Sequence, residues 1–280
     1  MSEAKLALVT GGSAGIGLEI ARGLAVAGYR TVLAVRSLER GEAAAADIAG
    51  TTRAPRPEVM GVDFSSPASI RLFADSFLSR HRSLDVLVNN AGTWSSSRRV
   101  TADGIELVWA TNQLGYFLTT ELLKPALLEA PRARVVSVAS ELARDLDLTD
   151  VSFERRRYNG ISSYAQSKQA NRMWTRALAR RFSGSGVTAN SLHPGGVATG
   201  LPGKSGGLLG KAAGLAMRAL GRTPREGADT ALWLATSDEV AGRTGLFYLD
   251  RRERRCRFTD EGEEEKLWAL CASMTGVKAG

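Results

Sequence analysis

The chain has 280 residues, of which 44% are hydrophobic and 24% are charged, as in an ordinary globular protein. Its formal charge is +8, but the basic residues are scattered and do not alternate with aromatic ones, which argues against a nucleic-acid-binding protein. No apolar stretch reaches about 18 residues and the N-terminus has no signal-peptide pattern, so we expect no integral membrane segment and a cytoplasmic location.

Short apolar runs, typical of strands buried on both faces, recur along the chain. They occupy residues 6–9, 31–35, 58–62, 84–88, 134–138, 187–192 and 246–248. Helical patterns stand between them, over residues 16–27, 38–49, 67–77, 104–128, 164–182 and 224–235, and a last helix ends the chain. Gly28 is expected to end the first helix, and Ser66 with Pro67 to open the third. This alternation predicts an α/β fold, a parallel sheet with helices on both faces, in a single domain.

A glycine-rich turn, Thr10-Gly-Gly-Ser-Ala-Gly-Ile-Gly17, follows the first expected strand. Glycines let the backbone approach a pyrophosphate, and the following helix N-terminus supplies amide donors and the positive end of the helix dipole. Turns use glycine for other reasons as well. The position between a strand and a helix nevertheless predicts a dinucleotide site at Gly11, Gly15 and Gly17.

The end of the second expected strand bears on the choice between NAD and NADP. An acidic residue there would bind the ribose 2′-hydroxyl of NAD. The sequence has Arg36 at this place, followed by Ser37 and Arg40, and a guanidinium pairs well with a 2′-phosphate. We therefore expect NADP(H); the alternative is that Arg36 is a solvated surface residue.

Tyr164 and Lys168 are four residues apart, so on a helix they lie on one face and can point into one pocket. The pKa of a free phenol is about 10, and a neighbouring ammonium favours the phenolate. The pair therefore predicts an acid–base site. Tyr158 is a rival tyrosine, but the residue four places after it is Ser162.

The two cysteines, Cys256 and Cys271, lie late in the chain and lack the spacing of metal ligands. We expect reduced thiols rather than a disulfide, as in a cytosolic protein, and no bound metal.

Together these motifs make the chain resemble the short-chain dehydrogenase/reductase family over nearly its whole length. The matching motifs, in chain order, are Thr10 to Gly17, Asp63, Asn89 to Gly92, Asn112, Ser140, Tyr164 with Lys168, and Pro194 with Gly195. Within the family the chain is most similar to the branch that contains the retinol dehydrogenases, through residues 101–106, 112–117 and 190–195. The resemblance implies one Rossmann-type domain over residues 1–280, a doubly wound sheet. The anchoring N-terminal segment common in that branch is missing here, so we expect a substrate other than retinol.

The resemblance implies a catalytic group of Asn112, Ser140, Tyr164 and Lys168. Ser140 is expected to hold the substrate oxygen, and Tyr164 to donate its proton as hydride reaches the carbonyl carbon. Lys168 is expected to lower the pKa of Tyr164 and to bind the nicotinamide ribose. Asn112 is expected to hold a water that passes protons to Lys168.

The resemblance also implies cofactor contacts. Asp63 and Phe64 are expected to flank the adenine, and residues 194–199 to meet the nicotinamide carboxamide. His193, just before this loop, is expected to be structural rather than an acid or base. The full expected set is Gly11, Ser13, Gly15, Ile16, Gly17, Arg36, Ser37, Arg40, Asp63, Phe64, Asn90, Ala91, Gly92, Tyr164, Lys168, Pro194, Gly195, Val197 and Thr199.

Ser140 precedes Tyr164 by 24 residues, roughly twice the spacing common in the family. The excess, around residues 145–157, is expected to form a surface loop near the substrate mouth, as in the retinol-dehydrogenase-like branch. Ser137 is a rival for Ser140. Strand alternation sends residues three apart to opposite faces, and the place of Ser140 at the carboxyl end of its strand favours it.

Residues 200–222 stand where substrate loops fall in this fold. We expect an amphipathic lid with solvated basic side chains, Arg222 among them; contact of these side chains with an anionic surface or an acidic substrate group is the alternative. The basic run at residues 251–255 is expected to be a solvated turn.

These expectations lead to an NADPH-dependent reductase of a hydrophobic ketone or aldehyde, for which a secondary-metabolite ketone is one candidate. An NAD-linked alcohol dehydrogenase and a non-catalytic dinucleotide-sensing regulator are the alternatives. Family members often pair through the helices that carry Asn112 and Tyr164, so a homo-oligomer is one expected state and a monomer the other.

Overall fold

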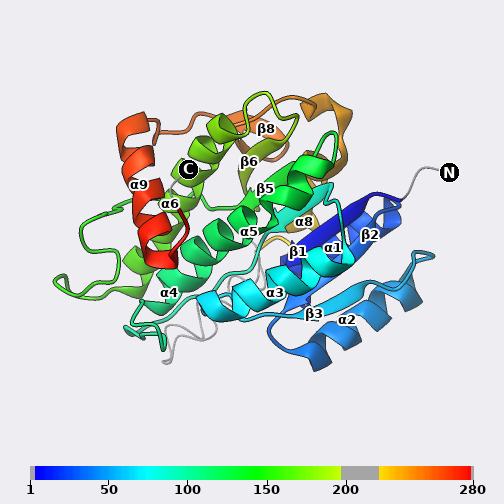
Figure 1. Ribbon diagram of the computed structural model, residues 1–280, viewed down its shortest axis with the longest axis horizontal. Helices are drawn as coiled ribbons and strands as arrows, with labels where there is room; N and C mark the ends of the chain where they lie inside the picture. The colour runs from blue at the N-terminus through cyan, green and yellow to red at the C-terminus, as the bar shows by residue number, and fades with distance from the viewer. Residues whose placement is uncertain (1–3, 197–220, 279–280) are drawn as a thin grey trace.

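The computed structural model describes residues 4–196 and 221–278, in which eight strands form one sheet (Figure 1). The strand order is β3-β2-β1-β4-β5-β6-β7-β8, and every neighbouring pair except β7 with β8 is parallel. The bounds are β1 Leu6–Thr10, β2 Arg30–Val35, β3 Glu58–Gly61, β4 Val86–Asn89, β5 Arg134–Val138, β6 Thr188–His193, β7 Phe247–Leu249 and β8 Arg252–Arg254. The order reverses between β1 and β4, which confirms the predicted doubly wound sheet.

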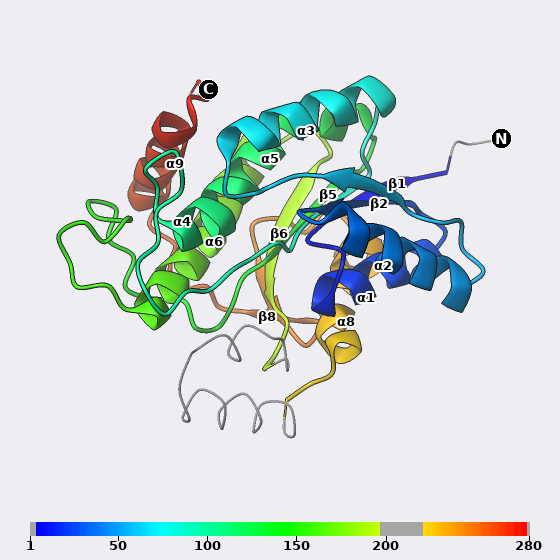
Figure 2. The ribbon, with the colours of Figure 1, turned by 90° about the horizontal axis from the view of Figure 1, so that it is seen from below.

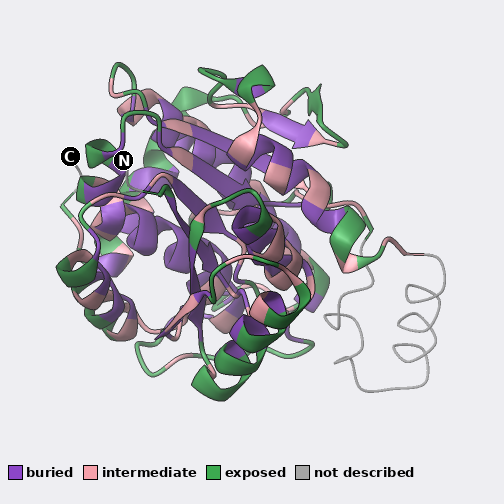
Figure 3. Cartoon of the chain, turned by 90° about the vertical axis from the view of Figure 1, so that its right-hand side faces the viewer, coloured by how far each residue is buried: buried purple, intermediate pink, exposed green. Residues whose placement is uncertain are grey.

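Helices cover both faces of this sheet (Figure 2). One face carries α1 (Gly15–Val26), α2 (Leu38–Thr51) and α8 (Pro224–Thr236), and the other carries α3 (Pro67–Arg80), α5 (Gly115–Glu129) and α6 (Gly160–Arg181). The shorter elements are α4 (Leu107–Trp109), a π-helical turn η1 (Ala110–Leu114) and a 3₁₀ turn η3 (Asp238–Val240). Because both faces are covered, the central strands β1 and β4 are buried along their whole length, as their continuous apolar runs predict (Figure 3).

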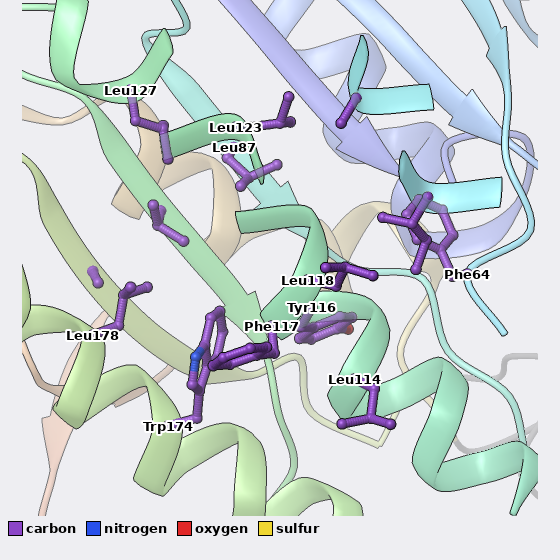
Figure 4. Packing of buried hydrophobic residues seen from close by; sticks show 14 of the residues in the cluster. Phe64, Leu87, Leu114, Tyr116, Phe117, Leu118, Leu123, Leu127, Trp174 and Leu178 are labelled. Atoms are coloured by element: carbon purple, nitrogen blue, oxygen red, sulfur yellow. The ribbon is translucent and has the colours of Figure 1, made fainter. Parts of the chain in front are cut away.

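The larger apolar core lies between the sheet and the layer of α3, α5 and α6. Phe117 of α5 and Trp174 of α6 are fully buried there and lie side by side (Figure 4). Complete burial of one such aromatic side chain contributes about 1.5–3 kcal/mol. The core therefore fixes α6, which carries Tyr164, against α5.

A further helix, α9 (Glu261–Thr275), packs on the outside of α6 (Figure 1). Glu264 is fully buried between the two helices, where its carboxylate pairs with Arg176 Nε at 2.7 Å and with Arg180. The ring of Trp268 meets that of Phe117 edge-on, with 5.0 Å between centroids. Thus α9 covers the outer side of α6 and reaches α5.

Local sequence explains where several helices begin. Ser66 accepts a hydrogen bond from the Ser69 N–H at 3.4 Å and Pro67 takes the first position of α3, as predicted. Asn159 caps α6 in the same way, through the N–H groups of the first turn. Because of this cap, α6 begins at Gly160, four residues before the predicted start.

The helix predicted over residues 104–128 is wrong at its N-terminal end. Gly104 has φ +76°, in the left-handed region that ends regular helix, and the helix begins at Leu107. After α4, which is only Leu107–Trp109, residues Ala110–Leu114 form the wider π-helical turn η1, and α5 follows directly from Gly115. Such turns are frequent at functional sites, and this one carries Asn112.

The strand predicted at residues 246–248 is not the last. The chain turns at Asp250 and Arg251, both with positive φ, and returns as β8, antiparallel to β7. The run at 251–255, predicted to be a solvated turn, is exposed but largely a strand. A run of charges has no apolar face that would indicate a strand; pairing with the edge of β7 supplies the structure instead.

Within residues 4–196 and 221–278, no helix is long and apolar enough to cross a membrane. Cys256 and Cys271 are free thiols, and Cys271 is buried.

Candidate active site

The carboxyl ends of β1 and β4 lie side by side, and hydrogen bonds join the loops that follow these two strands. The hydroxyl of Thr10, the last residue of β1, accepts hydrogen bonds from the N–H groups of Asn90 (2.8 Å) and Ala91 (2.9 Å). The Asn90 Nδ2 in turn donates to the Thr10 carbonyl at 2.9 Å. These bonds hold the glycine turn against residues 90–92, which belong to the expected cofactor contacts.

The glycines of this turn serve different purposes. Gly11 and Gly15 have φ of +68° and +57°, which favour glycine. A Cβ on Gly17 would lie less than 3.0 Å from both Asn90 Nδ2 and the Gly11 oxygen, so close packing requires a glycine there. A Cβ on Gly15 would meet nothing within 4 Å, which leaves open space above the first turn of α1.

The N-terminus of α1 faces that open space with its own amides. Ala14, the N-cap residue, makes no side-chain cap, and the first turn contains no acidic residue. The free N–H groups and the positive end of the helix dipole therefore fit a pyrophosphate. Of the other predicted contacts in this turn, Ser13 is half-exposed, whereas Ile16 is buried in the core.

Arg36, Ser37 and Arg40 lie beyond the carboxyl end of β2, next to the glycine turn, whose Gly11 N–H donates to the Ala34 carbonyl at 2.8 Å. The Ser37 hydroxyl caps α2 by accepting from the Arg40 N–H at 3.3 Å. Both arginines are exposed, and within the described part of the chain neither has an ion-pair partner. The guanidinium groups of Arg36 and Arg40 thus lie beside the glycine turn and the N-terminus of α1, without ion-pair partners among the described residues.

The residues predicted to flank the adenine follow β3. The Asp63 Oδ1 accepts from the Ser65 N–H at 2.9 Å and from its hydroxyl at 2.7 Å, which fixes the turn into α3. The Phe64 ring points into the core and is only 7% exposed (Figure 4). Contact of Phe64 with an adenine would therefore use its backbone. Gly92, in the next loop, lies beside Asn112.

Ser140, Tyr164 and Lys168 come together at the carboxyl end of β5. The Ser140 Oγ accepts a hydrogen bond from the Leu142 N–H at 3.1 Å and lies close enough to Tyr164 to act on the pKa of its hydroxyl. The Lys168 Nζ donates to the Val138 carbonyl at 2.8 Å and lies 5.6 Å from the centre of the Tyr164 ring. We call these three residues the catalytic cluster.

Burial governs the titration of this cluster. Desolvation raises the pKa of Tyr164 to about 12, although the nearby Ser140 hydroxyl acts in the opposite direction. Desolvation also lowers the pKa of Lys168 to about 7, because burial disfavours its charged form. The pKa shift of Tyr164 is therefore opposite to the lowering by Lys168 that we expected. At neutral pH Tyr164 is a neutral phenol, able to donate its proton.

Asn112 lies on η1, behind the cluster. Its Oδ1 accepts from the Thr93 N–H at 2.7 Å, and its Nδ2 donates to the Thr93 carbonyl and to the Ser167 hydroxyl, both at 3.1 Å. Its main-chain oxygen accepts from Asn171 Nδ2 at 2.8 Å. The side chain of Asn112 thus has protein partners for each polar atom, and a water on this residue stays a prediction.

The two rivals lie away from the cluster. Ser137 is fully buried within β5, paired with Asn89 of β4. The Tyr158 hydroxyl donates to the Ser95 carbonyl at 3.1 Å and lies 3.4 Å from Glu106 Oε1.

Glu106 is a functional candidate that the sequence reasoning missed. It is fully buried, and its Oε2 accepts from the Trp109 N–H at 2.8 Å and from the Ser163 hydroxyl at 3.2 Å. Desolvation raises the pKa of its carboxyl. This carboxylate joins α4 to the first turn of α6, because its partner Ser163 directly precedes Tyr164 in the sequence. Glu106 is the last residue of the motif at 101–106, but nothing in that motif indicates that its side chain is buried.

The segment expected to be a surface loop before α6 is anchored to that helix. The Asp150 carboxylate accepts from backbone N–H groups of the following turn, among them that of Arg156 at 2.9 Å. Val151 and Phe153 are buried, and Gln166 Nε2 of α6 donates to the Val151 carbonyl at 2.8 Å. The segment is thus partly core rather than all surface.

The loop after β6 is held by Arg222. Gly195 has φ +83°, and the Arg222 N–H donates to the Gly196 carbonyl at 2.8 Å. The Arg222 guanidinium pairs with Asp250, with an Nη2 to Oδ2 distance of 3.0 Å. Arg222, expected to be solvated or to meet an anion, therefore has a partner within the chain.

The structure describes the start of the predicted nicotinamide loop. His193, at the end of β6, is partly exposed, and desolvation lowers its pKa. Pro194 follows it directly. The predicted contacts Val197 and Thr199, and the expected substrate loop up to residue 220, lie outside the described residues.

Comparisons with known proteins agree with this geometry. A family model for short chain dehydrogenases matches residues 5–206. Human retinol dehydrogenase 13 is 35% identical over 285 residues, which cover 98% of this chain and 86% of that protein. The crystal structure of an uncharacterized protein from Mycobacterium paratuberculosis is similar with 32% identity and a TM-score of 0.76, over 97% of this chain and 93% of the other. An active-site complex of Pseudomonas aeruginosa RhlG with NADP has 27% identity and a TM-score of 0.66, over 87% and 93%.

Proposed function

The chain belongs to the short-chain dehydrogenase/reductase family, in its retinol-dehydrogenase-like branch, and from this premise we propose that it is an NADPH-dependent reductase of hydrophobic ketones or aldehydes. As a family member it is an oxidoreductase that uses a nicotinamide dinucleotide and interconverts a carbonyl and an alcohol of a small molecule. The observation that carries the proposal is the position of Tyr164, which lies one helical turn before Lys168 with 5.6 Å between the Lys168 Nζ and its ring centre, and has a pKa raised by burial to about 12.

The catalytic cluster performs the proton chemistry of this reaction. Bound NADPH would supply the hydride to the carbonyl carbon. The Ser140 hydroxyl holds the carbonyl oxygen, and Tyr164 donates its proton to that oxygen as negative charge develops there. An alkoxide is a stronger base than a phenolate, so this transfer is favourable even from a phenol with a raised pKa. A neutral Tyr164 suits reduction, since oxidation would require the phenolate first.

Lys168 acts on the phenolate that remains after the transfer. Its Nζ lies 5.6 Å from the centre of the Tyr164 ring, in surroundings dry enough to lower its own pKa to about 7. In a low-dielectric site a nearby ammonium stabilises a phenolate strongly. Once Tyr164 becomes negative, Lys168 therefore favours its own protonated form, and the two groups titrate as a pair.

The preference for NADPH is supported by Arg36 and Arg40, whose unpaired guanidinium groups stand beside the cradle for the pyrophosphate. A phosphate between two such cations is bound by charge-assisted hydrogen bonds, each contributing about 1.5–3 kcal/mol. The similar RhlG structure holds NADP in its active site, which supports the same cofactor here.

The substrate class is supported by the relatives. Human retinol dehydrogenase 13 is named for an apolar alcohol, and this chain aligns with it over nearly its full length. We therefore propose a hydrophobic carbonyl compound, with a secondary-metabolite ketone as one candidate. An NAD-linked alcohol dehydrogenase and a non-catalytic dinucleotide sensor remain the two competing functions.

Steady-state kinetics test the proposal. Oxidation of NADPH and of NADH is followed with a panel of hydrophobic ketones and aldehydes, for the native protein and for Arg36→Ala, Arg40→Ala and Arg53→Ala. Arg53 is an exposed arginine beyond the opposite end of α2 and serves as the matched control. We expect the KM for NADPH to rise about 10- to 100-fold in the first two variants, and to stay unchanged in the third.

Each competing function has its own outcome in this experiment. Equal use of NADH, with no effect of Arg36→Ala, supports the NAD-linked dehydrogenase. Binding of either cofactor without turnover of any carbonyl or alcohol supports the sensor.

A cytoplasmic location is also a proposal, consistent with the two free thiols. Cell fractionation followed by detection of the protein tests it, and recovery in the membrane fraction would contradict it.

The place of α9 bears on the surface through which chains associate. This helix packs on α6, the helix through which family members are expected to pair, and covers its outer side. We therefore propose that chains which associate do so through another surface. Light scattering on the purified protein measures whether it is a monomer.

A further inference from the structure

A buried amide on α6 connects two members of the predicted catalytic group. Asn171 lies three residues after Lys168 and is fully buried. Its Nδ2 donates to the main-chain oxygen of Asn112 at 2.8 Å, and its Oδ1 accepts from Lys168 Nζ at 3.3 Å. One side chain thus spans the distance between η1 and the lysine ammonium.

The same amide is held in place from behind. The second N–H of its Nδ2 donates to Gln113 Oε1 at 2.9 Å. Gln113 Nε2 lies 3.5 Å from the Cys271 sulfur of α9. Both donors and the acceptor of the Asn171 amide are therefore used, and a fully satisfied buried network of this kind allows only one orientation.

Asn171 thus directly links Asn112 and Lys168, the two residues that the family resemblance connects through a water. A water can pass a proton along such a path. An amide neither gains nor loses a proton near neutral pH, so it can only orient its neighbours. We propose that Asn171 is a positioning residue, which ties Lys168 to the Asn112 carbonyl and so fixes where the ammonium lies in the active site.

The donors of Lys168 support this role. An ammonium has three N–H groups. The Val138 carbonyl and Asn171 Oδ1 lie on the protein side of Nζ, at 2.8 and 3.3 Å. Two donors are thus directed to the protein, which leaves the third for a ligand hydroxyl or for Tyr164. Without Asn171, the ammonium would be held at one point and could rotate about it.

Among residues 4–196 and 221–278, few groups face Lys168. Tyr164 of its own helix and Tyr116 of α5 present their rings to Nζ, at 5.6 and 5.5 Å from the ring centres, and β5 presents the Val138 carbonyl. From α9, Cys271 reaches it only through Gln113 and Asn171. A charge placed at position 171 would therefore act on the lysine at short range.

Two substitutions at Asn171 and one control test the inference. Asn171→Leu keeps the volume and removes the bridge, and Asn171→Asp puts a carboxylate beside the ammonium. Thr175→Val is the matched control, because the Thr175 hydroxyl is equally buried on α6 and donates to the main-chain carbonyl of Asn171 at 2.7 Å, without contact to Lys168 or to the Asn171 side chain. The titration of Lys168 is read directly by NMR in protein labelled at its seven lysines, with the resonance assigned by its loss in Lys168→Met.

We expect the Lys168 midpoint to rise by about one pH unit or more in Asn171→Asp and to fall by about half a unit in Asn171→Leu. Thr175→Val should leave it in place. In turnover, kcat/KM should fall about tenfold or more in Asn171→Leu, with a shifted pH profile, and less than about threefold in the control. An unchanged Lys168 midpoint in both Asn171 variants would overturn the inference, as would equal effects in Thr175→Val. If Asn171→Leu does not fold, the Lys168 midpoint in Asn171→Asp alone tests the inference.

The consequence for turnover rests on the proposed function, whereas the NMR titration does not need turnover. If the native protein reduces no carbonyl but its Lys168 midpoint responds to Asn171, the reductase proposal fails and the bridge stands. If carbonyl reduction is found and the midpoint does not respond, the bridge fails and the reductase stands.

Discussion

The glycine turn after β1 and the catalytic cluster beside β5 lie at the same edge of the sheet, but they are built by opposite means. The turn is made of backbone: two left-handed glycines, a third where no Cβ fits, and the uncapped amides of α1. The cluster is made of buried side chains whose pKa values are shifted by desolvation. The turn is therefore a surface of fixed shape, whereas the cluster is a set of titratable groups with shifted pKa values.

This difference decides what a substitution does. In the turn, an added methyl group changes packing and ligand access while the chemistry of the remaining residues stays the same. In the cluster, removal of one polar atom leaves the shape intact and changes proton affinity. Stability and cofactor affinity should therefore report on the turn, and kcat with its pH dependence on the cluster. Four substitutions sharpen or break this distinction.

The largest effect is expected from Tyr164→Phe. It removes the proton donor and leaves the ring, so kcat should fall about 10³-fold or more, while NADPH affinity stays within about threefold of the native value. Tyr158→Phe is the control, since that hydroxyl lies away from the cluster. Stopped-flow kinetics and fluorescence titration measure both. A loss of NADPH affinity as large as the loss of kcat would contradict the distinction between the glycine turn and the catalytic cluster.

Lys168→Met should abolish most turnover but stabilise the fold, because it removes a buried charge. The pKa of Lys168 is about 7 in the folded chain and 10.5 by its ordinary value. Burial of the protonated form therefore costs stability below pH 7, and the cost declines as pH rises toward 10.5. We expect a gain of about 2–4 kcal/mol at pH 6 that shrinks by pH 10. Urea unfolding at several pH values tests this, and a pH-independent gain would contradict it.

Gly17→Ala should damage the turn itself. Its Cβ would lie less than 3.0 Å from Asn90 Nδ2 and from the Gly11 oxygen, so the backbone must move. We expect a loss of about 1–3 kcal/mol in unfolding free energy, with weaker NADPH binding as the cradle shifts. The pH dependence of any remaining kcat should be unchanged, because the cluster is untouched.

Gly15→Ala is expected to have the smallest effect on stability. The residue has φ +57°, which costs an alanine about 1 kcal/mol, but its Cβ would meet nothing within 4 Å. The new methyl would enter the space above α1, so NADPH affinity should fall by more than stability does. Thermal unfolding with and without NADPH separates the two effects; a larger loss than that of Gly17→Ala would contradict the account of the turn.

Sequence patterns predicted the turn well because its determinants are local. Strand, glycine spacing and helix follow one another within about 20 residues, and the alternation of strands and helices indicated the parallel sheet. Ser140, Tyr164 and Lys168 were found by their motif positions, and the structure brings them together.

The parts that sequence reasoning missed depend on partners far along the chain. Asn171 gains its meaning from Asn112, 59 residues away, and Glu106 from Ser163, 57 residues away. The spacing of Asn171 three residues after Lys168 was a usable signal, since such residues are neighbours on a helix. The pKa of Tyr164 was expected to shift downward because charge proximity can be read from spacing, whereas burial cannot.

The place of α9 has a consequence for biosynthesis. Every strand of the sheet leaves the ribosome before this helix does, because α9 follows β8 in the chain. Until α9 docks, Arg176 and Arg180 lack the carboxylate of Glu264, Phe117 lacks the cover of Trp268, and the Gln113 that backs the active site lacks Cys271. Such a partly covered apolar face is prone to aggregation. The support that α9 gives to α6 and Gln113 is therefore available only after the last segment of the chain has left the ribosome.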